Sequence, residues 1–106
     1  MDLSRAYPRS PKVKMAGLVQ LARMIDKAKA YKEKQIADYD YPCPLDKIIL
    51  NFLRVDSEVF ATKAMESGDE EIRTWAEVTM KNKKPEEIGF INEQILERKP
   101  DSEDRL

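Results

Sequence analysis

The sequence lacks histidine altogether, which removes several classes of functional site at once. Histidine is the commonest general base near neutral pH and one of the commonest zinc ligands. Without it, the serine and cysteine triads in their usual forms and most zinc sites are excluded. The carboxylates also match no calcium-binding loop. We therefore expect no metal ion and no cofactor.

Glycine, cysteine and long apolar runs are scarce as well. The three glycines form no glycine-rich phosphate-binding loop. The single cysteine, Cys43, cannot form an internal disulfide, and the first residues lack the layout of a signal peptide. No apolar run approaches the roughly 20 residues that cross a bilayer. These absences indicate a cytoplasmic protein without a membrane segment.

The residues that are abundant favour helices. Leu, Ile, Ala, Met, Lys and Glu dominate the 106 residues, and charged side chains make up 37% of them. We expect an all-α fold, namely a compact bundle of about five helices with an extended N-terminal arm. The predicted parts are an extended basic arm over residues 1–14, a single helical domain over residues 15–98, and a disordered polar tail over residues 99–106.

The net charge of −1 conceals an uneven distribution. Residues 1–34 carry nine Lys and Arg against three acids, a net charge of +6, whereas residues 35–106 carry a net charge of −7. The basic part could serve an anionic partner. We favour the alternative, in which the two parts attract each other within the folded protein.

Spacing and capping residues predict where the helices lie. Apolar residues recur every three or four positions from about residue 15 or 18 to residue 34, which predicts a first helix with one buried stripe. Arg23, Asp26 and Lys27 fall on the opposite arc, where Arg23 and Asp26 are spaced to pair along the surface. The starts of three later helices are predicted at Asp56, Asp69 and Pro85.

The segment from Tyr39 to Phe52 combines the single cysteine with two prolines and the most apolar run of the chain. Pro44 suits the first position of a helix, which makes Cys43 the N-cap and Asp46 the third helical residue. The Cys43 thiol is then either a small buried apolar group or a reactive group at a positive helix end. Asp46 would oppose a second negative charge at that end.

Three short motifs of this chain resemble those of a family of small, mostly bacterial helical proteins known as a domain of unknown function. The motifs are Pro8-Arg9-Ser10-Pro11, Arg23-Met24-Ile25-Asp26-Lys27 and Tyr41-Pro42-Cys43-Pro44-Leu45-Asp46. Pro42 departs from the family's usual Tyr-Asn-Cys-Pro-Leu-Asp-like segment. The resemblance covers about residues 2–98 and implies a compact, mainly helical domain, with no particular activity, substrate or cofactor.

Three candidate functions follow, and we favour a non-enzymatic binding or interaction module over an enzyme. Its ligand or protein partner would be anionic or of mixed charge, and its site would lie where the arm, the first helix and Cys43 meet. The candidate ligand-binding residues are Arg9, Ser10, Arg23, Asp26, Cys43 and Asp46. One alternative is a thiol-dependent enzyme or redox sensor that uses Cys43. The other is a weak nucleic-acid binder, which we disfavour because the helix after Gly68 begins with three acids.

Overall fold

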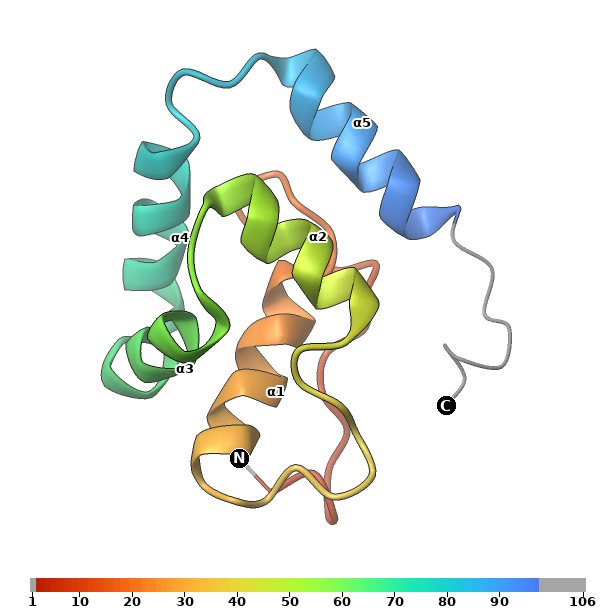
Figure 1. The fold of residues 1–106 in the computed structure, drawn as a ribbon, viewed down its shortest axis with the longest axis vertical. Helices are drawn as coiled ribbons and strands as arrows, with labels where there is room; N and C mark the ends of the chain where they lie inside the picture. Colours follow the sequence, from red (N-terminus) through yellow and green to blue (C-terminus); the bar gives the residue numbers. More distant parts are fainter. Residues whose placement is uncertain (1, 98–106) are drawn as a thin grey trace.

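The computed structural model describes residues 2–97, and these form five α-helices (Figure 1). The helices are α1 (Leu21–Lys32), α2 (Pro44–Leu53), α3 (Ser57–Glu66), α4 (Asp69–Thr79) and α5 (Pro85–Leu96). The described residues contain no β-strand, only an isolated bridge between Met15 and Leu18. The predicted all-α fold is confirmed. The tail predicted over residues 99–106 lies outside the described residues, and the three predicted parts of the chain stay predictions.

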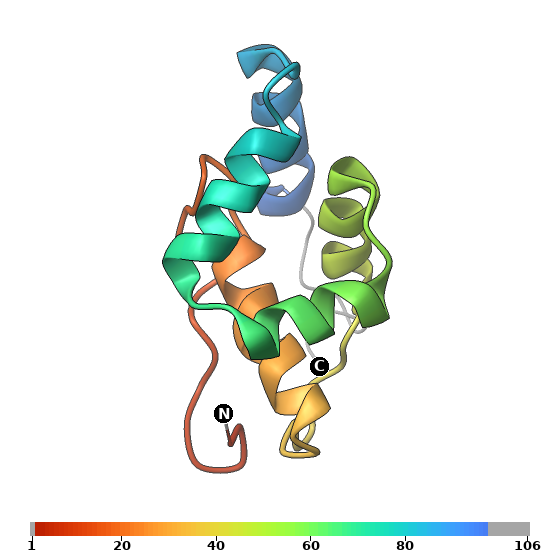
Figure 2. The same cartoon turned by 90° about the vertical axis from the view of Figure 1, so that its left-hand side faces the viewer.

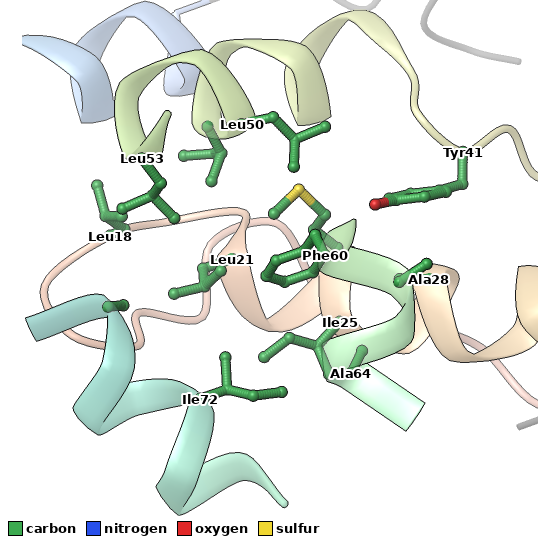
Figure 3. Packing of buried hydrophobic residues seen from close by; sticks show 14 of the residues in the cluster. Leu18, Leu21, Ile25, Ala28, Tyr41, Leu50, Leu53, Phe60, Ala64 and Ile72 are labelled. Carbon is green, nitrogen blue, oxygen red and sulfur yellow. The ribbon is translucent and has the colours of Figure 1, made fainter. Parts of the chain in front are cut away.

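Helix α1 is the centre of the fold. It makes its most extensive contact with α3, which passes across it in Figure 2, and a smaller one with α2. Helix α2 also lies against α5. Apolar side chains from α1, α2, α3 and α4 meet in one core, which Figure 3 shows from close by. The labelled side chains of these four helices are Leu21, Ile25, Ala28, Leu50, Leu53, Phe60, Ala64 and Ile72.

Helix α1 begins later than the spacing predicted, because the chain first makes a tight turn. Met15 and Leu18 exchange two backbone hydrogen bonds of 2.9 Å, and Gly17 between them has a φ of 81°, which glycine adopts without steric cost. Gln20, the N-cap of α1, also has a positive φ of 72°. Leu18 and Val19 are buried in this turn, so their apolar side chains indicate burial and do not indicate a helix.

The charged side of α1 is enclosed, contrary to prediction. Asp26 and Lys27 are only 7% and 3% exposed. The N-terminal arm covers Asp26, because both the backbone and the side chain of Arg9 donate to its carboxylate. The arm is tied further by two backbone hydrogen bonds of 2.8 Å, from Leu3 to the Gln35 carbonyl and from Gln20 to the Pro11 carbonyl. Helix α1 is therefore surrounded by helices on one side and by the arm on the other.

The start of α2 is as predicted. Pro44 is its first residue, Cys43 is the N-cap, and Asp46 at the third position accepts a hydrogen bond of 3.0 Å from the Cys43 backbone N–H. Helix α3 is capped by Asp56 and α5 begins at Pro85, again as predicted.

The start of α4 differs from prediction by one residue. Its N-cap is Gly68 and not Asp69, and Glu71 accepts from the Gly68 N–H at 2.9 Å. Asp69 is thereby free to bind a remote residue. None of the described helices has the length and apolar character that a membrane crossing requires.

Candidate functional site

Arg9 joins the arm to two helices. Its guanidinium donates to both carboxylate oxygens of Asp26 on α1 at 3.0 Å, and to Asp69 at the start of α4 at 2.8 Å. Burial alone would lower the pKa of Arg9, but the hydrogen bonds to these two carboxylates raise it. In turn, the hydrogen bond from Arg9 lowers the pKa of Asp69. We call Arg9, Asp26 and Asp69 the arm clamp.

The other two candidate residues of the N-terminal half, Arg23 and Ser10, do not join the arm clamp as predicted. Asp26 pairs with Arg9 and not with Arg23. The Arg23 side chain instead donates to the Arg9 carbonyl at 3.3 Å, and its guanidinium lies 5.6 Å from the centre of the Tyr39 ring. Ser10 is exposed, and its hydroxyl accepts from the Lys12 backbone N–H at 3.1 Å. Ser10 therefore stabilises a turn of the arm.

A second group of polar side chains lies between α1 and the start of α2. It consists of Gln20, Lys27, Cys43 and Asp46, and we call it the Asp46 cluster. The Lys27 ammonium forms an ion pair of 2.8 Å with Asp46 Oδ2, and it donates to Cys43 Sγ at 3.2 Å. The other carboxylate oxygen, Oδ1, accepts from the Gln20 amide nitrogen at 2.9 Å.

The Asp46 cluster is buried except at Cys43. Gln20 and Asp46 are 1% and 0% exposed, whereas Cys43 is half-buried. Taking an ammonium and a carboxylate out of water costs several kcal/mol per ion, and well-packed apolar residues often replace such a pair without loss of stability. Stability alone therefore does not explain why this fold contains the pair. A buried polar cluster whose one half-buried member is a cysteine is the strongest candidate site of the molecule.

One acceptor in the cluster has no partner. Within residues 2–97 no donor reaches Gln20 Oε1, although this oxygen is buried. Exchanging the two amide atoms of Gln20 would place the oxygen against the Asp46 carboxylate, so the observed orientation is the one electrostatics allows. An unpaired buried acceptor costs about 1–3 kcal/mol. Gln20 also has a positive φ, and such strain gathers at functional sites.

The arm clamp and the Asp46 cluster adjoin each other, because Asp26 and Lys27 are consecutive residues of α1. The structure therefore groups the predicted site residues as Arg9 with Asp26, and Cys43 with Asp46. Sequence reasoning missed Gln20, Lys27 and Asp69. Lys27 belongs to one of the quoted motifs, but a lysine is so seldom buried that exposure was the default interpretation.

No metal centre is indicated within the described part of the chain. No group of three or more His, Cys, Asp or Glu side chains is placed there to hold a metal ion.

The fold and its site define a small all-α domain with a buried Lys–Asp pair beside a half-buried cysteine. Residues 5–106 match the family model described as Domain of unknown function (DUF5069), and the chain belongs to this family. The resemblance drawn from the three motifs is thus confirmed. The description of the family names no activity. No curated protein matches the chain.

Proposed function

We propose that this protein is a cytoplasmic binding module that holds a small polar ligand of mixed charge at the Asp46 cluster. The observation that supports the proposal is the unpartnered Gln20 Oε1. A ligand with an N–H or O–H group supplies the donor that this oxygen lacks. The ligand would enter beside Cys43, since this residue is the one half-buried member of the cluster.

The charges around the site favour a ligand of mixed charge over a purely anionic one. Lys27 is already neutralised by Asp46, and Arg9 by Asp26 and Asp69. An anion entering the cluster would meet the Asp46 carboxylate without a free cation to offset it. An ammonium carries three donors, and two acceptors are seen at Lys27 Nζ among the described residues. A ligand acceptor at the third hydrogen would then satisfy all three donors of the Lys27 ammonium.

Titrations of the ¹⁵N-labelled protein with four small probes test this function. Glycine and acetamide carry N–H donors, whereas acetate and inorganic phosphate are mainly acceptors. We expect glycine and acetamide to shift the amide signals of Gln20 and Cys43 in a saturable way. Shifts that are equal or larger with acetate and phosphate would contradict the proposal. The absence of saturable shifts with all four would also contradict it, because a buried water then satisfies Gln20 Oε1.

A matched pair of variants tests whether the ligand binds at Gln20. Gln20→Met removes both polar atoms of the side chain at nearly constant length, and we expect it to abolish the shifts. Gln94→Met makes the same change at an exposed position of α5 and is expected to leave them intact. If both variants respond as the wild type does, the ligand binds elsewhere and the placement at Gln20 is wrong.

Ion pairs between the basic and acidic parts of the chain support the internal interpretation of the charge over a nucleic-acid partner. Among residues 2–97, three cations of the basic part lie within 4.0 Å of carboxylates of the acidic part, and these pairs are Arg9–Asp69, Lys27–Asp46 and Lys32–Glu58. Phosphate binding needs several free cations on one face. Gel-shift measurements at low salt check this point, and a salt-sensitive shift would reverse the preference.

A further inference from the structure

We propose that a hydroperoxide oxidises Cys43 and that Lys27 then closes on the oxidised sulfur, forming a covalent Sγ–Nζ bond. This inference does not depend on the proposed ligand. The two atoms are already in contact at 3.2 Å. Asp46 Oδ2 aligns them, because it binds Lys27 Nζ at 2.8 Å and the Cys43 backbone N–H at 3.0 Å.

The oxidant comes from solvent, whereas the amine belongs to the buried cluster. Cys43 is half-buried, which gives a small hydroperoxide access at this residue, whereas Lys27 is only 3% exposed. The buried Gln20 side chain shares the Asp46 carboxylate with the Cys43 backbone N–H, and its unpartnered Oε1 is an unfilled acceptor of the same cluster. The site therefore holds a nucleophile, an oxidisable sulfur and an unfilled acceptor together.

The chemistry balances with hydrogen peroxide as the oxidant. In the first step the sulfur attacks one peroxide oxygen, the O–O bond breaks, and the products are a sulfenic acid and one water. In the second step the Lys27 amine forms the N–S bond, the S–O bond breaks, and the hydroxyl leaves as a second water with a proton from nitrogen. The ammonium must first give up a proton, and Asp46 Oδ2 at 2.8 Å is an acceptor within reach.

The sequence excludes the other reactions that a sulfenic acid usually undergoes. The chain has one cysteine, so no internal disulfide can form. Sulfenic acids also condense with a backbone nitrogen. The residue that follows Cys43 is Pro44, which has no N–H to form such a bond. Lys27 is thus the nitrogen nucleophile that the fold presents to the sulfur.

Mass spectrometry of the peroxide-treated protein tests the inference. We expect a loss of about 2 Da from the intact chain, recovered by a thiol reductant, because a thiol and an amine each lose one hydrogen. Peptide mapping should then find Lys27 joined to Cys43. Gains of about 16 or 32 Da located on Cys43 itself, without a joined peptide, would overturn the proposal, because the sulfur has then stopped at sulfenic or sulfinic acid.

Two lysine variants sharpen this test. Lys27→Arg keeps a cation beside Asp46 but removes the amine, so its oxidised thiol should be trapped by dimedone as sulfenic acid. Lys29→Arg makes the same change two residues along α1 and should still form the bond. Equal dimedone trapping in the wild type and both variants would refute a role for Lys27. If Lys27→Arg does not fold, the peptide map of the wild type decides alone.

Discussion

The Lys27 ammonium and the Asp46 carboxylate form an ion pair of 2.8 Å in which the two side chains are 3% and 0% exposed. Lys27 lies in the middle of α1 and Asp46 in the first turn of α2, so the pair ties the two helices together. Asp46 has a second role, since it also accepts from the N-cap of α2. One carboxylate therefore serves a helix end, an ion pair and the candidate site.

Replacing Lys27 by methionine should destabilise the protein by about 3–5 kcal/mol, because it leaves Asp46 buried without its counter-ion. The double variant Lys27→Met/Asp46→Asn should recover much of this loss. An asparagine oxygen still accepts from the Cys43 N–H, and no charge remains buried. Urea unfolding of the wild type, both single variants and the double variant measures the coupling. Losses that simply add would show that the pair is not coupled.

Removal of the Arg9 side chain should loosen the arm. Arg9→Ala breaks charge-assisted hydrogen bonds to the buried Asp26 carboxylate, each worth about 1.5–3 kcal/mol, and the exposed contact with Asp69, worth about 1 kcal/mol or less. We expect lower stability and faster amide hydrogen exchange in the arm. Arg5→Ala is the control, because Arg5 meets Asp2 at 3.8 Å with its side chain 87% exposed, and such pairs contribute little. Equal losses for both variants would rule out a clamp at Arg9.

The Asp69 contact should show a defined pH dependence. The pKa of Asp69 is lowered below its ordinary value of 3.8 in the folded protein, chiefly by the hydrogen bond from Arg9. A lowered folded-state pKa gives stability that is complete above the unfolded value and is lost as the pH falls through the folded value. The stability difference between the wild type and Asp69→Asn should therefore be present at pH 6 and vanish in acid.

The size of this difference is small. Asp69 is 46% exposed, so solvent screens the pair and we expect about 1 kcal/mol or less. Unfolding measurements from pH 6 downward check the sign. A difference that grows as the pH falls below 3.8 would contradict the assignment of the shift to Arg9.

Two glycines should respond oppositely to alanine. Gly17 has a φ of 81°, so Gly17→Ala strains the backbone and should cost about 1–2 kcal/mol. Gly89 lies inside α5, where an added Cβ meets nothing within 4 Å, so Gly89→Ala should stabilise the protein by about 0.5–1 kcal/mol. Thermal unfolding of the two variants compares them directly. A gain of stability from Gly17→Ala would show that the turn before α1 is not formed as described.

Features set by neighbouring residues could be predicted from the sequence, and features set by remote residues could not. The Pro44 start of α2 and the Asp56 cap of α3 depend on a few adjacent residues, and both predictions are confirmed. The first turn of α1 was misassigned, because residues buried in a turn share the spacing of a helix face. The burial of Lys27 was missed for a different reason. Its partner is 19 positions away in the sequence, so only the tertiary fold reveals the compensation for its charge.

Labelling of lysines in the folded protein tests the central claim most directly. The protein is treated briefly with an acetylating reagent, and peptide mapping gives the extent of modification at each lysine. The account predicts that Lys27 stays unmodified while exposed Lys12 and Lys32 react, and that Asp46→Asn opens Lys27 to the reagent. Modification of Lys27 in the wild type at the rate of Lys12 would show that no sealed Asp46 cluster exists.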